Sequence, residues 1–405
     1  MRPFDQRLTA AMCCVVCALA GCARKGPVVP APPTAPVAAM PLTHKAKAKA
    51  KFAYTGNQGR TLSGYSVNIS TGALTALPGF PLASGVSPTA VAVDPQSRFL
   101  FVGDISIDKL YVFAINSSTG ALDGIGAYPT VHEPVAIVVD PSGTHVYVAS
   151  QGSNLVYGFN LNSSGGLKTI AGSPFATSGT KGFGSDMVID AAGTFLYVED
   201  IFSIYTYSVN AGSGSLTLVQ TITGPLQGGT IALDPRGTYL YAVGAGANSI
   251  QAYRINPSTG LLTPASSSPM GTRTGAYTIS ISPNGRFAYT IENTSDLVSY
   301  AVNDGVFTPI GSVYSQVYGA RIGIDPSGRF VYVPQACSNC SGAAYDVVNE
   351  FSIGRTGALK KIPGSPVAAG KTPWDIAITT RKPPARRWWS RFWSAFRCGN
   401  RRQGP

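Results

Sequence analysis

The sequence predicts an all-β protein whose residues 52–380 form a single domain, a seven-bladed β-propeller of four-stranded antiparallel blades. Three observations predict it. The 405-residue chain has 46 Gly and 30 Pro but only 12% charged residues, which disfavours a helical protein. Its 44% hydrophobic content disfavours disorder and is enough for a large core. Two turn patterns then recur along the chain at nearly constant spacing, which is typical of a repeat architecture.

The first pattern is a turn followed by an alternating strand. Its copies begin at Asp94 (DPQSRFLFVGD), Asp140 (DPSGTHVYVAS), Asp190 (DAAGTFLYVED), Asp234 (DPRGTYLYAVG), Ser282 (SPNGRFAYTIE) and Asp325 (DPSGRFVYVPQ). Asp, Pro and Gly at the first, second and fourth positions suit a type I turn. The second pattern ends in Gly-x-Leu or a close variant, with glycines at 72, 120, 165, 214, 260, 305 and 357. One repeat therefore spans roughly 45 residues, the length of a propeller blade.

Each repeat has room for four strands. In the second repeat we expect strands at Ala90–Val93, Arg98–Val102 and Lys109–Ile115, and a short strand after Leu122. The body begins at 52–57 with a second strand and ends at 374–379 with a first strand. Pairing these two ends completes the seventh blade and removes an open sheet edge.

The N-terminus reads as a lipoprotein export signal over residues 1–21. Arg2 and Arg7 precede a short apolar run that ends in Leu19-Ala20-Gly21-Cys22, which resembles a bacterial lipobox. That resemblance implies diacylation of Cys22 and anchoring in the cell envelope, with the outer membrane favoured because Ala23 follows the cysteine. Ordinary cleavage without a lipid is the alternative. Residues 22–51 form a Pro/Ala/Lys-rich linker. Its lysines make it either a solvated arm or an arm that binds anionic lipid or cell-wall polymer electrostatically.

The formal net charge of +12 lies in the tails. Segments 1–22, 23–51, 52–380 and 381–405 carry +1, +6, −3 and +8, which sum to +12. If the tail 381–405 forms a helix, its aromatic rings lie on one face, and such a helix suits binding at a membrane interface. The residues expected there are Trp388, Trp389, Arg391, Phe392, Trp393, Phe396 and Arg397. A disordered or propeller-docked tail is the alternative, and export disfavours nucleic acid as a partner.

The body resembles a known family. Leu196-Tyr197-Val198, the Ser-Thr-Gly-Ala-Leu turns at 70–74 and 118–122, and Ala171-Gly-Ser-Pro-Phe-Ala176 with its echo at 363–368 are similar to bacterial lactonase-type propellers. That family includes 6-phosphogluconolactonase-like proteins and YVTN-repeat surface proteins. The resemblance implies the propeller fold and, for enzymatic members, histidine, acidic and arginine groups at the channel mouth.

Geometry places the candidate site on one rim, because the ends of second strands and the starts of first strands meet there in an antiparallel blade. For lactone hydrolysis, His132 or Glu133 is the expected base and Arg321 the expected electrophile. Acidic residues on the same rim are candidate ligand-binding groups: Asp104, Asp186, Asp200, Glu292 and Asp375. The alternative is that all of these are solvated rim residues. We predict no cofactor and no metal site.

The remaining cysteines and histidine have simpler interpretations. Cys337 and Cys340 are expected to form a local disulfide in an exported protein, since the body has no second Cys pair for a zinc site. Cys398 is a lone thiol. His145 occupies the aromatic position of its repeat, which favours a packing role.

Three functions follow. The favoured one is a lipid-anchored envelope module, monomeric, that binds a small molecule or envelope polymer. The second is a lactonase acting on a sugar lactone at the mouth, and the third is a purely structural envelope protein.

Overall fold

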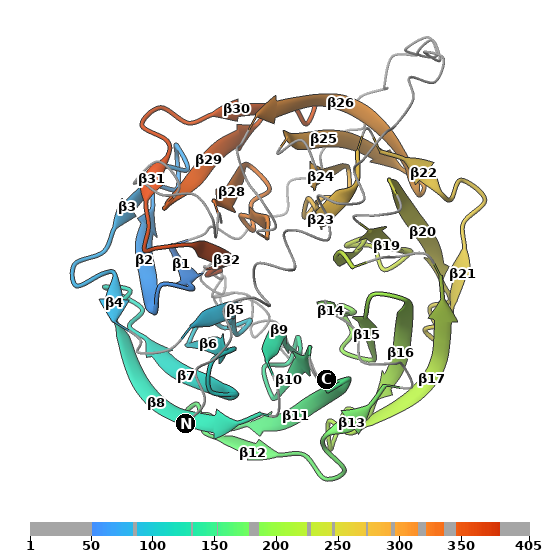
Figure 1. Ribbon diagram of the computed structural model, residues 1–405, viewed down its shortest axis with the longest axis horizontal. Coiled ribbons are helices and arrows are strands. Elements are labelled where there is room, and N and C mark those ends of the chain that lie inside the picture. The colour runs from blue at the N-terminus through green and yellow to red at the C-terminus, as the bar shows by residue number, and fades with distance from the viewer. Residues whose placement is uncertain are drawn as a thin grey trace, which may run out of the picture. The chain divides into compact units, whose positions relative to one another are not determined.

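The fold is an all-β ring of seven blades, as predicted. The computed structural model describes residues 51–380 except 84–86, 131–132, 152, 178–185, 225–227, 245–247, 273, 293–295, 315–320 and 336–345. Figure 1 shows the blades arranged around a central channel, with the first strand of each blade innermost. Within the described ranges, no helix is long and apolar enough to cross a membrane.

The first four blades run from the inner strand to the outer edge as follows. Blade 1 contains β32 (Pro373–Ile378), β1 (Phe52–Asn57), β2 (Thr61–Val67), β3 (Leu74–Ala76) and β4 (Leu82–Ala83). Blade 2 contains β5 (Pro88–Val93), β6 (Phe99–Asp104), β7 (Lys109–Ile115) and β8 (Leu122–Pro129). Blade 3 contains β9 (Pro134–Val139), β10 (His145–Ser150), β11 (Leu155–Leu161), β12 (Leu167–Thr169) and β13 (Phe175–Ala176). Blade 4 contains β14 (Asp186–Ile189), β15 (Phe195–Glu199), β16 (Ser203–Val209) and β17 (Leu216–Thr223).

The last three blades repeat the same order. Blade 5 contains β18 (Ile231–Leu233), β19 (Tyr239–Gly244), β20 (Ser249–Ile255), β21 (Leu262–Pro264) and β22 (Met270–Gly271). Blade 6 contains β23 (Ala276–Ile281), β24 (Phe287–Glu292), β25 (Asp296–Asn303) and β26 (Val306–Tyr314). Blade 7 contains β27 (Gly323–Ile324), β28 (Phe330–Pro334), β29 (Val347–Ile353), β30 (Leu359–Lys361) and β31 (Val367–Ala368).

The four strands predicted for the second repeat are present in blade 2, and β8 is longer than the short strand expected.

The two ends of the body close the ring. β1 pairs with β32 in antiparallel register, with Ala53 opposite Ile378 and Gly56 opposite Asp375. Beyond the strand, the Thr379 amide donates to the Phe52 carbonyl at 2.9 Å. The closure inferred from the unmatched first and last strands is therefore confirmed.

The turns explain where the second strands begin. In blade 3 the Gly143 amide donates to the Asp140 carbonyl at 2.9 Å, and Gly143 has a φ of 71°. The Asp140 carboxylate accepts the amides of Thr144 and His145, each at 2.7 Å. The carboxylates of Asp94, Asp190 and Asp325 accept the corresponding amides, so in these blades the first side chain of the turn caps the start of the second strand.

The core lies between the blades. Seven buried apolar clusters each combine side chains of two neighbouring blades, one cluster for each seam of the ring. Tyrosine hydroxyls of second strands add a hydrogen bond to the turn glycine of the next blade. These pairs are Tyr54–Gly120, Tyr147–Gly214, Tyr197–Gly260, Tyr289–Gly357 and Tyr332–Gly72, at 2.7–3.1 Å. The seams hold the inner strands in fixed positions around the channel.

Candidate active site at the channel mouth

One position of the repeat forms a ring at the mouth. It lies within two residues of the first residue of each inner strand. Going around from blade 1 its residues are Asp375, Ala90, Ala136, Asp186, Thr230, Thr278 and Arg321. Asp186, Arg321 and Asp375 are the members that the sequence predicted for this rim. We call it the mouth ring.

Three members of the mouth ring bind the next blade. Asp375 Oδ2 accepts the Val91 amide at 2.9 Å, and Asp186 Oδ2 accepts the Ile231 amide at 3.0 Å. Thr230 Oγ1 accepts a third backbone amide, from Ile279, at 2.9 Å. These side chains therefore fasten adjacent inner strands to each other while they line the mouth.

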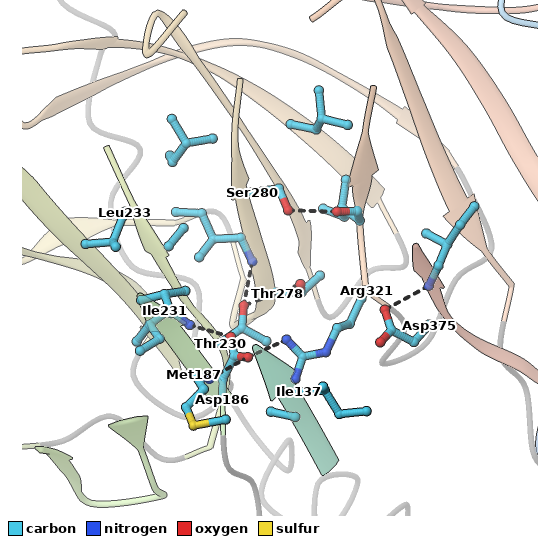
Figure 2. A pocket seen from close by; sticks show the side chains of 18 of the residues that line it. Ile137, Asp186, Met187, Thr230, Ile231, Leu233, Thr278, Ser280, Arg321 and Asp375 are labelled. Atoms are coloured by element: carbon cyan, nitrogen blue, oxygen red, sulfur yellow. Dashed lines mark hydrogen bonds and ion pairs between the residues drawn. The ribbon is translucent and has the colours of Figure 1, made fainter. Parts of the chain in front are cut away.

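Arg321 extends across the channel. Its Nη1 donates to Asp186 Oδ1 on blade 4, although the arginine belongs to blade 7 (Figure 2). Its Nη2 lies 3.4 Å from the carbonyl oxygen of Val135 on blade 3. The arginine side chain is 27% exposed, whereas that of Asp186 is 4% exposed. A guanidinium group carries five N–H donors, so the ion pair fixes its orientation while donors remain for a ligand.

The channel itself is a cavity of about 400 Å³. The mouth is lined by Asp186, Arg321 and Asp375. Farther from the mouth the wall is mostly apolar, because residues farther along the inner strands have branched apolar side chains. These side chains include Ile137, Leu233, Ile281 and Ile324. Its size and polarity suit a small polar molecule held at the mouth end.

The charges of the mouth are coupled. Burial raises the pKa of Asp375, while the Arg321 guanidinium and the amides of Val91 and Ile376 oppose the rise. Burial alone would lower the pKa of Arg321, but Asp186 and Asp375 outweigh it and raise that pKa. Arg321 is therefore a permanent cation held between two carboxylates.

A further acid, Glu199, lies behind the mouth ring. It pairs with Asp186 across β14 and β15 and is fully buried. Neither carboxylate oxygen makes a hydrogen bond of ordinary geometry with the described residues. Burial raises its pKa well above the usual value, with Asp186 and Asp200 adding to the rise and the Gly229 amide and Arg321 opposing it. The surroundings of Glu199 therefore favour its neutral form over its ionised form.

Sequence reasoning did not single out Glu199, although aligning the repeats reveals it. The corresponding residues of the other blades are small or apolar: Gly56, Gly103, Ala149, Val243, Ile291 and Pro334. A Cβ atom at Gly56 or Gly103 would meet Pro88 or Pro134 of the next blade. The position therefore faces a seam, where an acid is unexpected.

Three predicted ligand groups lie away from the cavity. Asp104 accepts the amides of Ser87 and Ser106, and Asp200 accepts the Tyr205 hydroxyl at 2.8 Å. Glu292 likewise accepts the Tyr300 hydroxyl at 2.7 Å. Each holds loops or strands of its own blade, and none lines the channel cavity.

Glu133 lies on the loop that enters blade 3, two residues before the Val135 carbonyl that Arg321 approaches. Its backbone has a φ of 48°, and its amide donates to Asp108 Oδ1 at 2.9 Å. Thr372, at the corresponding place in blade 1, shares this conformation, with a φ of 53°. What distinguishes blade 3 is the acidic side chain. His132, its neighbour, lies outside the described residues.

Other predictions also fall outside the described residues: the lipidation residue Cys22, the pair Cys337 and Cys340, and the tail 381–405. Among the residues that are described, no three His, Cys, Asp or Glu side chains are grouped closely enough to hold a metal ion.

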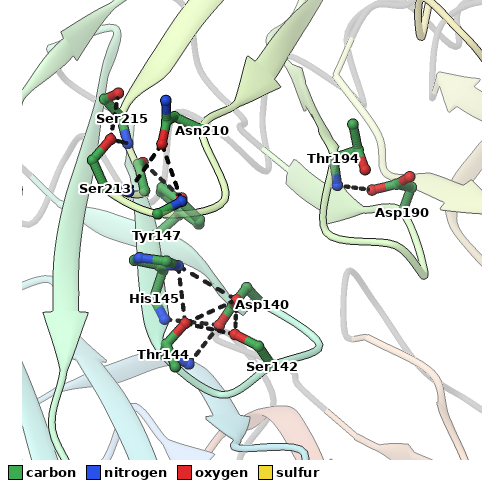
Figure 3. Close-up of polar contacts among 12 residues, drawn as sticks. Asp140, Ser142, Thr144, His145, Tyr147, Asp190, Thr194, Asn210, Ser213 and Ser215 are labelled. Atoms are coloured by element: carbon green, nitrogen blue, oxygen red, sulfur yellow. Dashed lines mark hydrogen bonds and ion pairs between the residues drawn. The ribbon is translucent and has the colours of Figure 1, made fainter.

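His145, the other histidine of the body, begins β10 at the end opposite Ser150, which pairs with Pro134 where blade 3 starts. Figure 3 shows its ring beside the Asp140 turn. Its buried ring packs at the Gly214 turn of the next blade, and Nδ1 lies 3.1 Å from Thr144 Oγ1 and 3.4 Å from Asp140 Oδ2. Burial would raise the pKa of Asp140, but hydrogen bonds from Ser142 and the amides of His145 and Thr144, with the His145 charge, outweigh it and lower that pKa. His145 therefore has the packing role expected from its repeat position.

Comparison with known proteins supports the seven-bladed propeller fold. The family model described as lactonase, 7-bladed beta-propeller matches residues 46–180 and 137–278, which together span more than half of the chain. No curated protein matches the sequence.

Solved structures are similar in fold. A putative 6-phosphogluconolactonase from Bacteroides uniformis shares 16% identity, with a TM-score of 0.71 over 82% of this chain and 100% of the other. The periplasmic gluconolactonase of Pseudomonas aeruginosa shares 17% identity, with a TM-score of 0.68 over 81% of this chain and 98% of the other. At such identities, the likeness establishes the fold alone.

Proposed function

Because this chain belongs to the lactonase family of seven-bladed β-propellers, we propose that it hydrolyses a lactone at the mouth of its channel. The observation that carries the proposal is Arg321, a cation held by Asp186 across a cavity of about 400 Å³. Family membership favours this activity over the binding module that the sequence first favoured.

The proposed reaction needs an acceptor for negative charge and a base for water. Water adds to the lactone carbonyl, the ring C–O bond breaks, and the ring oxygen leaves as a hydroxyl. Arg321 stabilises the oxyanion, because its guanidinium is oriented before the substrate arrives. Glu133 or His132, on the loop entering blade 3, removes the proton from water and returns it to the ring oxygen as the C–O bond breaks. The substrate class is a sugar lactone, whose hydroxyls suit the polar mouth while the ring reaches the apolar wall.

The test is proton release from glucono-δ-lactone and 6-phosphogluconolactone above the spontaneous rate. We expect turnover by the wild type. The rate of hydrolysis should fall roughly 10²–10⁴-fold in either His132→Ala or Glu133→Gln, depending on which of the two side chains is the base. His145→Phe is the matched control, because other blades carry Phe there, and it should retain activity. Saturable lactone binding without turnover would instead support the binding module.

We also propose that the protein is exported and held at the cell envelope by lipid on Cys22. The lipobox-like Leu19–Cys22 and the +6 linker support this. Radiolabelled palmitate should be incorporated into the wild-type chain and absent from Cys22→Ser. Equal labelling of the two would contradict the lipid anchor.

A further inference from the structure

A second repeat position closes the outer part of several seams. It is the third residue after the Leu or Phe at the start of each fourth strand, and its residues are Leu77, Ile125, Ile170, Val219, Ala265, Ile310 and Ile362. We call it the seam plug. Leu77, Ile125, Ile170 and Ile310 each reach the turn glycine of the following blade, at Gly120, Gly165, Gly214 and Gly357. In these blades a branched side chain fills the space between neighbours.

Blade 5 departs from this arrangement. Its seam plug is Ala265, and the facing turn of blade 6 is two residues shorter than that of blade 5, Asn303–Phe307 against Asn256–Leu262. The short turn is formed by Asp304 and Gly305, with φ values of 46° and 79°. A cavity of about 620 Å³ lies between the two blades at this point. The small plug and the short turn both leave room for it.

The same seam leaves a tyrosine hydroxyl without its usual partner. In five blades this hydroxyl donates to the turn-glycine carbonyl of the next blade. Tyr241 is the corresponding residue of blade 5; it is fully buried, and its hydroxyl has no hydrogen-bond partner among the described residues. Its ring stacks on Tyr239, which lines the cavity, with the centroids 5.9 Å apart. The packing of the seam is therefore incomplete beside the cavity.

The cavity wall combines donors, acceptors and an apolar patch. Arg254 Nη2 donates to the Tyr239 hydroxyl at 2.6 Å, and that hydroxyl donates to Asp304 Oδ1 at 2.8 Å. Arg254 and Asp304 are 4.0 Å apart, and their side chains are 57% and 75% exposed. The remaining lining residues are mostly hydroxyl-bearing or small apolar ones: Thr263, Pro264, Ala265, Ser266, Ser267, Asn303, Val306 and Thr308.

We propose that this seam cavity binds a neutral saccharide unit. The charges of Arg254 and Asp304 cancel, so neither an anion nor a cation gains a net attraction there. A sugar offers hydroxyl donors and acceptors for the arginine, carboxylate and hydroxyl groups, while its C–H face covers the apolar patch around Ala265 and Val306. The volume is in the range of small-ligand pockets. This site is separate from the channel mouth and does not depend on the proposed hydrolysis.

The experiment titrates the purified protein with glucose, N-acetylglucosamine and maltose by calorimetry. At least one should bind saturably with a Kd near 1 mM or below. Ala265→Leu introduces a branched side chain like those of the other blades and should weaken binding at least about tenfold, since the added carbon atoms project into the cavity and narrow it. Arg254→Ala should also weaken it. Val219→Leu, at the same repeat position of blade 4 where the side chain is 41% exposed, is the matched control and should bind normally.

Ala265→Leu is also expected to raise the melting temperature. That result would show that the variant folds and that its leucine side chain packs in the cavity. Two results would overturn the proposal. The first is that none of the three sugars binds saturably at concentrations up to about 10 mM, which is ten times a Kd of 1 mM. The second is that the wild type and Ala265→Leu bind the sugar with equal affinity.

Discussion

At the residue scale, Glu199 is the least expected feature of the site. It is a buried carboxyl at a seam position where other blades have small or apolar side chains. Because Asp186 and Arg321 interact with it electrostatically, its protonation sets the charge balance behind the mouth ring.

Glu199→Gln should therefore change how stability depends on pH. The folded pKa of Glu199 lies above the ordinary value of 4.5, so ionisation disfavours the folded state as pH rises from about 4.5 through the folded pKa. Glutamine mimics the neutral acid and removes this loss. Urea unfolding should show similar free energies for both proteins below about pH 4.5 and a growing advantage of the variant above it. A difference that does not vary with pH would contradict the assignment.

At the element scale, the blades are held together by a repeated bond between a second strand and the next turn. The Tyr54 hydroxyl donates to the Gly120 carbonyl at 2.8 Å, whereas the Tyr241 hydroxyl has no such partner among the described residues. The two tyrosines occupy the same repeat position, which makes them a matched pair.

Tyr54→Phe should lower the free energy of unfolding by about 1 kcal/mol, because it leaves a buried carbonyl without its donor. Tyr241→Phe removes a hydroxyl that has no acceptor and should be neutral or slightly stabilising. Denaturant unfolding of the two variants measures this difference. Equal losses would show that the hydroxyl of Tyr241 is satisfied in solution.

The elements were predictable to different degrees. The turn pattern after Asp94, Asp140 and its other copies fixes the second strands because Pro, Gly and an Asp side chain dictate a local conformation. The mouth ring was also predictable, since the starts of antiparallel first strands must meet on one rim. The pairing of Arg321 with Asp186 was not, because it joins blades whose relative position depends on every seam between them. Glu199 and Ala265 required aligning each repeat position across all blades.

At the scale of the whole molecule, ring closure depends on the last strand of the body. β32 pairs with β1, and Thr379 Oγ1 accepts the Phe52 amide at 2.9 Å. The Thr380 amide also donates to Ser97 Oγ, at 2.8 Å, which fastens the chain to blade 2. Residues up to 380 therefore contribute to the closed ring.

Truncation tests this directly. A chain ending at Thr380 should keep the melting temperature and the oligomeric state of the full chain. A chain ending at Lys371 lacks β32 and exposes the buried strand β1, so it should aggregate or melt far lower. A stable monomer from the shorter chain would contradict closure by β32.

The central claim is that the mouth hydrolyses a lactone through Arg321. The most direct measurement is the rate of glucono-δ-lactone hydrolysis by the wild type and by the double variant Arg321→Met/Asp186→Asn. The double change removes the Arg321–Asp186 ion pair as a unit, and the buried Asp375 keeps the Val91 and Ile376 amides as hydrogen-bond partners. We predict turnover above the spontaneous rate by the wild type and a loss of roughly 10²–10³-fold in a variant with an unchanged melting temperature. Equal rates in the two proteins would contradict the account.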